Sequence, residues 1–310
     1  MWSLQVKIKN VHGAPLLLLI ISVLLIISRL VKMPFLSDEG NVYLASAVLQ
    51  VLILAIPPAI YARARGRKFF SHLRFKLFKA IDIPMMIFAL GLMIFGGATI
   101  SFYIYRVAPE FFRTSASAMM AEGSGDAGTV IYALLSVAIL PAITEEFLFR
   151  GIVTAEYERN GVALAVVLSS LTFALIHFDL VRIPVYFFNG VILALTLYAT
   201  RSLFATMTVH AANNILAMFL EVYVYRAAAR QGGGIVLFTF ICTALTLLFA
   251  FLFFNSCSKA YSDLAWINAP SDYAKKKKAP EGGGYVREAL TSPFFIILLA
   301  VSAVGIILNF

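Results

Sequence analysis

Long apolar segments recur along the whole chain, and they constrain its fold more than any other feature. The sequence has 61% hydrophobic and only 13% charged residues, whereas soluble domains of average composition are about one quarter charged. A helix needs roughly 20 apolar residues to cross the hydrocarbon core of a bilayer. We therefore predict an all-α, polytopic transmembrane helical bundle that forms a single integral membrane domain over residues 1–310.

We expect eight to nine membrane spans, separated by polar segments. Their approximate ranges are 14–31, 43–62, 82–105, 128–148, 162–178, 182–200, 203–225, 234–255 and 290–309. Lys7 and Lys9 precede the first span, and no convincing cleavage motif follows it, so we interpret this span as a retained helix. The polar stretch 256–288 contains several Pro and Gly residues and predicts a cytoplasmic linker before the last helix.

The basic residues predict the orientation of the chain. The formal net charge of +9 is concentrated in the loop 63–79, in the run Lys275–Lys278 and at the N-terminus, and the positive-inside rule assigns all three to the cytoplasm. Nine spans then leave the C-terminus outside, together with Asp38, Glu39, Glu110, Glu122 and Asp126. The chain is expected to be a multi-pass protein of the cell membrane. Topology and anionic lipid account for the charge, and we expect no nucleic acid partner.

The segment 63–81 also allows a different local structure. Five apolar residues alternate there with the cations, namely Phe69, Phe70, Leu73, Phe75 and Leu77. A helix with this pattern would lie at the lipid headgroups, parallel to the membrane surface.

Only two cysteines occur, Cys242 and Cys257. Their number excludes a disulfide framework, and no Cys-x-x-Cys spacing indicates a zinc site. We expect two thiols packed among membrane helices.

Two adjacent carboxylates and an arginine lie in otherwise apolar sequence, in the segment that contains Glu145, Glu146 and Arg150. A charge in hydrocarbon costs several kcal/mol, on the order of 3 or more, so such groups usually serve a function. Residues four apart share a helix face, so Glu146 and Arg150 are able to pair. Glu145 then faces elsewhere and remains available as a proton acceptor. The alternative is that both glutamates cap the helix among wet headgroups.

Two of the four histidines, His177 and His210, also lie in long apolar segments. Asn214 is four residues beyond His210 on the same helix face, and together they offer two hydrogen-bond donors to one oxygen, as an oxyanion site requires. Each histidine alone is more often a packing residue. Together with the glutamates they indicate peptide hydrolysis by water, with Glu145 accepting the proton and His177 helping to hold the water.

Three motifs in this order are similar to a known pattern: Glu145-Glu146-x-x-x-Arg150, Phe173-x-x-x-His177 and His210-x-x-x-Asn214. The chain resembles the CAAX protease and bacteriocin-processing family of intramembrane proteases, which includes the Ras-converting CAAX endopeptidase. The motifs cover roughly residues 128–225, which we expect to be the catalytic core.

The resemblance implies a helical membrane protein with a catalytic cavity and a membrane-associated or lipid-modified peptide as substrate. It assigns the water-activating role to Glu145, assistance at the water to His177 and the oxyanion site to His210 and Asn214. Glu146, Arg150 and Phe173 would support them. Members of this family have been described both as glutamate proteases and as metalloproteases. We favour a metal-free site without a cofactor, and the alternative is a zinc site formed by Glu145, His177 and His210.

Two functions without proteolysis remain possible from the residues. A transporter or channel could use the buried glutamates and histidines to relay protons or bind a cation. A membrane scaffold could keep the fold without turnover.

Overall fold

The computed structural model describes residues 10–30, 39–107, 131–158, 161–229, 233–262 and 284–309. Every regular element in these ranges is helical, as the predicted fold class requires. Seven helices in the described ranges are long and apolar enough to cross a membrane, and two shorter apolar helices cover Val162–Leu175 and Pro293–Leu308. Each of these nine helices overlaps one of the nine expected ranges, and seven of them have the length of a membrane span. The chain is a membrane protein.

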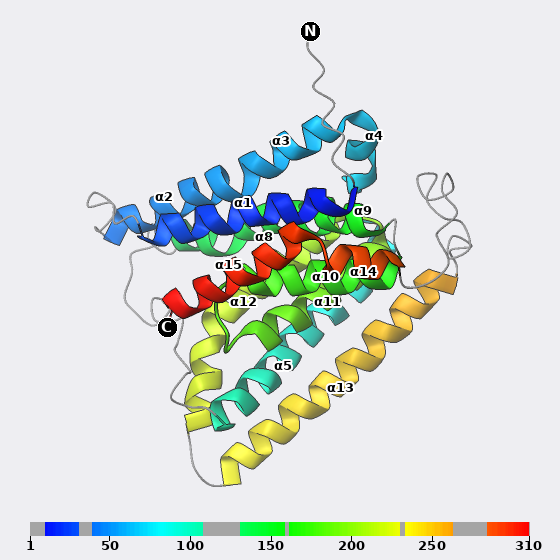
Figure 1. Cartoon of the computed structure of the whole chain (residues 1–310). Coiled ribbons are helices and arrows are strands. Elements are labelled where there is room, and N and C mark those ends of the chain that lie inside the picture. Colours follow the sequence, from blue (N-terminus) through cyan, green and yellow to red (C-terminus); the bar gives the residue numbers. More distant parts are fainter. Residues whose placement is uncertain are drawn as a thin grey trace.

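The helices cross the molecule one after another and pack side by side (Figure 1). In chain order they are α1 (Asn10–Leu30), α2 (Glu39–Gln50), α3 (Ile56–Arg65), α4 (Arg67–Phe70), α5 (Ile83–Val107), α8 (Leu140–Glu146), α9 (Thr154–Tyr157), α10 (Val162–Leu175), α11 (Ile183–Thr200), α12 (Leu203–Ala229), α13 (Gly233–Ser262), α14 (Gly284–Leu290) and α15 (Pro293–Asn309). Three π-helical segments extend these helices: η2 (Val51–Ala55), η6 (Leu134–Ile139) and η7 (Phe147–Val153).

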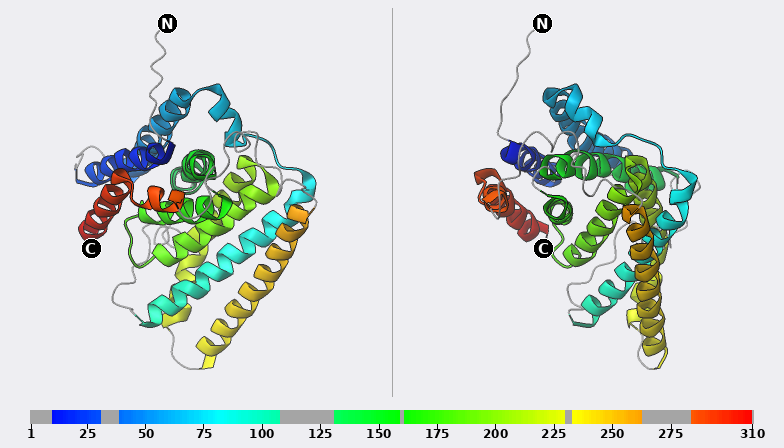
Figure 2. Two further views of the ribbon diagram at one scale, coloured as in Figure 1. Left: turned by 45° about the vertical axis from the view of Figure 1, so that its right-hand side comes forward. Right: turned by 90° about the vertical axis from the view of Figure 1, so that its right-hand side faces the viewer.

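Two apolar clusters form the core. One joins α1, α3, α10, α15 and η7 through residues such as Leu18, Phe149 and Phe173. The other joins α5, α11, α12 and α13 through residues such as Met93 and Phe253. The paired helices α1 and α15, and the long helices α5 and α13, lie on different sides of the bundle (Figure 2).

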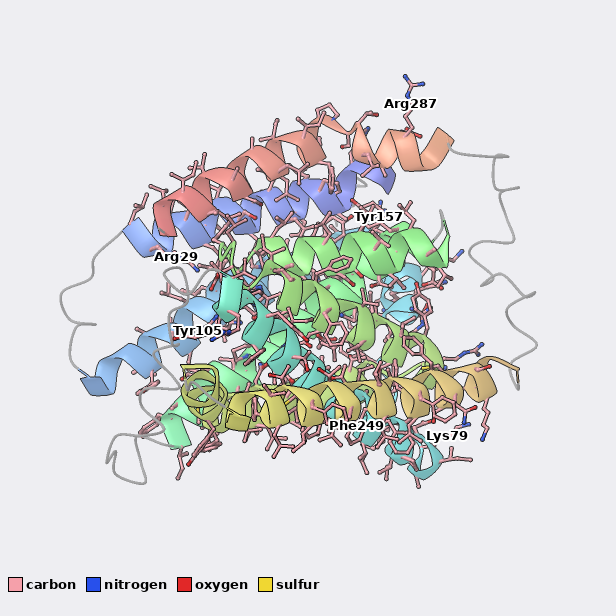
Figure 3. The ribbon with its side chains drawn as sticks, turned by 90° about the horizontal axis from the view of Figure 1, so that it is seen from below. Arg29, Lys79, Tyr105, Tyr157, Phe249 and Arg287 are labelled. Carbon is pink, nitrogen blue, oxygen red and sulfur yellow. The ribbon has the colours of Figure 1, made fainter. Side chains whose placement is uncertain are left out.

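Figure 3 shows Lys79, Tyr157 and Arg287 toward one end of the bundle, which we call the Lys79 end. Arg29 and Tyr105 lie toward the opposite end, the Arg29 end. The helix α5 therefore leads from the Lys79 end to the Arg29 end.

The basic segment after α3 packs against other elements of the Lys79 end. Arg74 forms an ion pair with Glu158 at 2.7 Å, and its carbonyl oxygen accepts a hydrogen bond from the Leu203 N–H at 2.9 Å. The expected surface helix over 63–81 is wrong, because α4 and two single 3-10 turns are the only helical elements between Arg65 and Ile83. Phe69 and Leu73 are buried in the core rather than facing lipid headgroups.

The fourth span differs from the prediction at its end. It runs from Ile131 to Tyr157 as one continuous helix, not to residue 148, and residues 151–157 belong to it rather than to the next helix. The charge of Glu156, which made this stretch resemble a loop, is paired with an arginine in the fold. Arg65 donates to both oxygens of Glu156, at 2.7 and 2.6 Å.

This longer helix explains how Glu145 and His177 come to the same depth. Glu145 is twelve residues from Tyr157, which corresponds to about 18 Å along a helix. The following helix, α10, has only 14 residues and returns antiparallel, about 21 Å long. His177 follows its C-terminus and therefore lies level with the glutamate instead of at the far side of the membrane.

The remaining expectations concern segments near α13. This helix continues to Ser262 and α14 begins at Gly284, so the predicted linker 256–288 is helical at both ends, and 263–283 lies outside the described residues. Lys7, Lys9, Lys275–Lys278, Asp38, Glu110, Glu122 and Asp126 also lie outside them. Cys242 and Cys257 are buried free thiols, as expected.

Candidate active site

The two glutamates are the last residues of α8, near the middle of the fourth span. Pro141 lies in the first turn of this short α-helical stretch, and π-helical segments precede and follow it. Proline has no N–H to donate, and π segments change which carbonyl oxygens are used within a helix. Such segments are frequent at functional sites because they redirect side chains and free backbone groups.

Glu146 is the centre of a buried ionic network. Its Oε1 accepts hydrogen bonds from Arg150 Nη1 at 2.7 Å and from His210 Nδ1 at 2.9 Å. Arg150 also donates from Nη2 to the Gly190 carbonyl oxygen at 3.0 Å. The sequence predicted the pair four residues apart, and this contact is present with both side chains fully buried. The network joins α8, α11 and α12.

Phe173 fills the space between the charged and the imidazole groups. Its ring lies 4.5 Å beneath the Arg150 guanidinium carbon. The centroids of His177 and His210 lie 5.0 and 5.7 Å from the centroid of this ring, each with edge contacts. The contacts with Phe173 limit how far either imidazole can turn.

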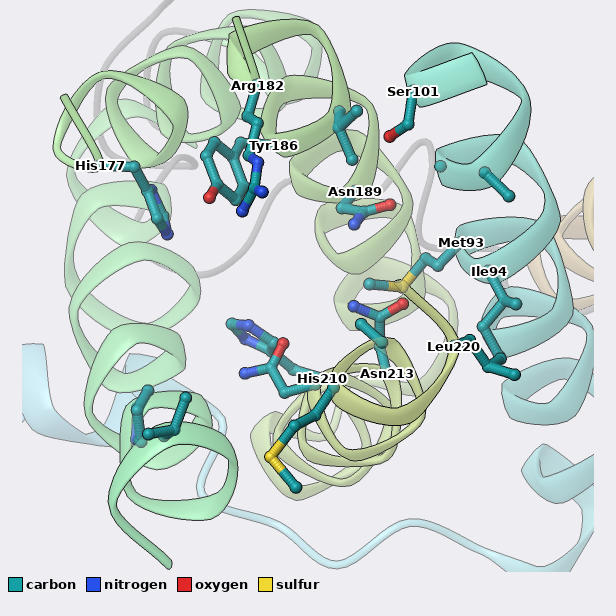
Figure 4. A pocket seen from close by; sticks show the side chains of 18 of the residues that line it. Met93, Ile94, Ser101, His177, Arg182, Tyr186, Asn189, His210, Asn213 and Leu220 are labelled. Atoms are coloured by element: carbon teal, nitrogen blue, oxygen red, sulfur yellow. The ribbon is translucent and has the colours of Figure 1, made fainter. Parts of the chain in front are cut away.

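A cavity of about 580 Å³ brings the predicted polar groups together. Glu145, His177, His210 and Asn214 all line it, and Phe173 forms part of the wall. Glu146 and Arg150 are not among the residues that line it. Figure 4 shows His177 and His210 projecting into this space from different helices. Of the adjacent glutamates, only Glu145 is thus open to a bound molecule.

Hydrogen bonds fix the orientation of both imidazoles. His177 Nδ1 lies 2.8 Å from the Phe173 carbonyl oxygen, which only accepts, so Nδ1 donates and Nε2 is left for other partners. His210 Nδ1 donates to the Glu146 carboxylate, and its Nε2 lies 3.9 Å from Glu145 Oε2. His210 therefore donates a hydrogen bond from Nε2 only when both ring nitrogens carry hydrogen.

Asn214 is the least committed of the predicted groups. Its Nδ2 donates over a long 3.4 Å to the Ala138 carbonyl oxygen in η6. A bound oxygen in the cavity could replace this acceptor at little cost, since a contact of this length is weak.

The alternative zinc site is considered first by the hydrogen bonding of its two histidines and then by the distances between its three side chains. His177 and His210 both hold Nδ1 in a hydrogen bond and leave Nε2 free, as metal-binding histidines usually do. Within the part of the chain that the structure describes, however, no three His, Cys, Asp or Glu side chains lie close enough to hold a metal ion.

Sequence reasoning missed several polar residues that line the cavity. Gln50 donates to Thr144 Oγ1 at 3.0 Å, next to Glu145 in the chain. Tyr186 stacks on His177 with ring centroids 3.9 Å apart. Asn189 and Asn213 line the same space. Gln50 and Asn189 could have been found from the sequence, because each is an isolated amide inside an apolar span. Polar groups are costly there, and the glutamates were selected on that ground.

One comparison with known proteins gives a match. Residues 127–216 match the family model described as Rce1-like, type II CAAX prenyl endopeptidase. No curated protein and no solved structure gives a match. The matched range contains all three motifs and the helices from η6 to about the middle of α12. The resemblance that the motifs indicated is confirmed over this range: residues 127–216 of this membrane protein match the Rce1-like CAAX endopeptidase model.

Proposed function

We propose that this protein is an intramembrane endopeptidase in which Glu145 activates a water molecule to hydrolyse a peptide bond. The observation that carries the proposal is the arrangement around the cavity. Glu145, His177, His210 and Asn214 all border it, and the adjacent Glu146 is held outside it by Arg150 and His210. The catalytic core is the proposed range of about 128–225.

Glu145 acts as the general base in this proposal. Its carboxylate takes a proton from water while the water oxygen attacks the carbonyl carbon of the substrate. The same carboxyl group then gives that proton to the departing amine as the C–N bond breaks. His177 Nε2, fixed by the hydrogen bond of Nδ1 to Phe173, accepts a hydrogen bond from the second O–H of the water and orients it.

His210 and Asn214 stabilise the negative oxygen that forms on the substrate. Asn214 donates from its amide, and His210 donates from Nε2 with both ring nitrogens protonated. Glu146 then balances the positive charge of that ring through the 2.9 Å contact at Nδ1. In this proposal, the role of Glu146 is to stabilise the protonated His210 ring from the side that faces away from the substrate.

The substrate that fits best is a membrane-associated or lipid-modified peptide. The family description names prenylated CAAX peptides, and the cavity wall carries long apolar side chains such as Met93, Phe95 and Phe238 beside its polar groups. A lipid-linked chain would be accommodated against such a wall. We further propose location in the cell membrane with the Lys79 end in the cytoplasm, because its basic residues follow the positive-inside rule.

The test compares wild type with Glu145→Gln, which keeps the side chain size and removes the base. Purified proteins are incubated with a membrane-peptide library that includes prenylated and unprenylated members. We expect cleavage by wild type and a loss of at least about 100-fold in Glu145→Gln, the usual contribution of a general base. Glu288→Gln, on α14 and away from the cavity, serves as the matched control and should cleave normally.

Two further measurements separate the alternatives. Activity that survives exhaustive chelation supports the metal-free version, and activity restored only by zinc would favour the metalloprotease. Ion flux in proteoliposomes that is lost in Glu145→Gln, without any peptide cleavage by wild type, would replace the protease with a transporter.

A further inference from the structure

Asn189 is a cavity-lining residue that the proposed catalytic steps do not use. It lies on α11, is 9% exposed and is labelled in the close-up of the cavity (Figure 4). Its Oδ1 is buried and has no hydrogen-bond partner among the described residues. Two other amides of the cavity are already engaged through their nitrogen atoms: Gln50 donates to Thr144 Oγ1 and Asn214 donates to the Ala138 carbonyl oxygen.

The position of Asn189 is tied to the catalytic frame. The next residue is Gly190, whose carbonyl oxygen accepts the hydrogen bond from Arg150. A Cβ atom on Gly190 would lie 2.9 Å from Ser170 Cβ, which is closer than side chains pack, so α10 and α11 are in close contact here. The backbone that carries Asn189 is therefore fixed relative to Glu146 and His210.

A buried amide oxygen without a partner is costly. Leaving such a group unpaired usually costs about 1–3 kcal/mol, and replacing it with an apolar group of similar shape removes that cost. Leucine would fit the apolar surroundings of this helix, so packing alone does not explain an amide here. The unused acceptor points to a donor that arrives with a bound molecule.

A peptide substrate brings such a donor. When an extended peptide leaves water for a cavity inside the membrane, each backbone N–H and C=O loses its water partners and needs replacements. We propose that the Asn189 side chain accepts a hydrogen bond from a backbone N–H of the substrate, at a peptide unit other than the one that is cut. This inference rests on the proposed endopeptidase and adds a substrate-backbone subsite on α11.

The first experiment compares stability with activity in Asn189→Leu. Removing an unpaired buried amide should leave the melting temperature unchanged or raise it, while kcat/KM falls about tenfold through loss of one substrate hydrogen bond. A residue that only supports the fold would lower both. Ser302→Ala is the matched control, because Ser302 Oγ on α15 is also buried without a partner among the described residues and lies away from the cavity. It should leave kcat/KM unchanged.

The second experiment identifies the partner atom. A cleaved peptide is resynthesised with single backbone amides replaced by esters, which removes one N–H at a time. In wild type, one replacement outside the scissile bond should lower kcat/KM about tenfold. In Asn189→Leu, and in Asn189→Ala should the larger side chain prevent folding, the same replacement should cost nothing further.

The outcomes separate this inference from the proposed function. Wild-type cleavage with equal ester penalties in wild type and variant would overturn the Asn189 subsite and leave the protease intact. A variant with unchanged kcat/KM would do the same. No cleavage of any peptide by wild type would overturn the proposed function, and the subsite with it.

Discussion

Glutamate–arginine pairs occur at two places in and just after the fourth span, and the two regions differ in how the pairs are made. At the centre of the span, Glu146 pairs with Arg150 of the same helix, and both side chains are fully buried. At the Lys79 end, Glu156 and Glu158 pair with Arg65 and Arg74 from the segments around α4. The central pair holds His210 beside Glu145, whereas the end pairs fasten one polypeptide segment to another.

The comparison teaches that burial decides what an ion pair contributes. A buried pair gains little over apolar packing but is costly to break, because one charge is then left alone. A partly exposed pair contributes about 1 kcal/mol or less, since water replaces the lost partner. The central pair should therefore be the most sensitive to substitution, and the three pairs should form a graded series.

The largest effect is expected for Arg150→Met. This change leaves Glu146 buried without its main partner and should lower the free energy of unfolding by about 3–5 kcal/mol. Thermal unfolding in detergent measures the loss. The double variant Glu146→Gln/Arg150→Met removes both charges and should recover much of the stability but not the peptidase activity, because His210 loses its carboxylate. Recovery of full activity would show that Glu146 has no role beyond pairing.

Glu156→Gln should have an intermediate effect. The Glu156 side chain is fully buried and accepts hydrogen bonds from Arg65 and from Tyr61 Oη. Arg65 is 17% exposed, so its charge can regain water after the change. We expect a loss of about 1–3 kcal/mol in stability, with kcat/KM nearly unchanged below the melting temperature. A large fall in kcat/KM of the folded variant would contradict the separation between the end of the span and its centre.

The smallest effect is expected for Glu158→Gln. Both partners of this pair are 18% exposed, and the loss should be at most about 1 kcal/mol. High salt should reduce the difference between wild type and variant, since it screens exposed charges. Melting curves at low and high salt provide the measurement, and a salt-independent loss as large as that of Glu156→Gln would mean that this pair is effectively buried.

The graded series also indicates which contacts sequence reasoning could reach. The pair Glu146–Arg150 was predictable because four residues bring two side chains to the same helix face regardless of tertiary structure. The pair Arg65–Glu156 joins residues 91 positions apart, and no local rule connects them. The fourth span was predicted to end at 148 for the same reason. Glu156 and Glu158 interrupt the apolar pattern, and nothing nearby in the sequence shows that arginines from another segment pair with them.

The cavity shows the same limit. Glu145, His177, His210 and Asn214 were selected because polar groups are costly in apolar spans, and the fold gathers them around one space. Gln50 and Asn189 satisfy that criterion too, but a single amide is a weaker signal than a charge. Neither residue has a second polar group of the site near it in the sequence. Only the packing of α2 and α11 places them beside the catalytic groups.

The sequence by itself determined the helical membrane architecture, the family motifs and the local pairing within one helix. These follow from the cost of polar backbone in lipid and from the 3.6-residue period, which act over a few turns of chain. The tertiary structure alone decided that a long fourth helix meets a short fifth one at the depth of Glu145. It also decided that the carboxylate left unpaired by Arg150 shares one cavity with His177, His210 and Asn214, because that depends on how α10 and α12 pack against the fourth helix.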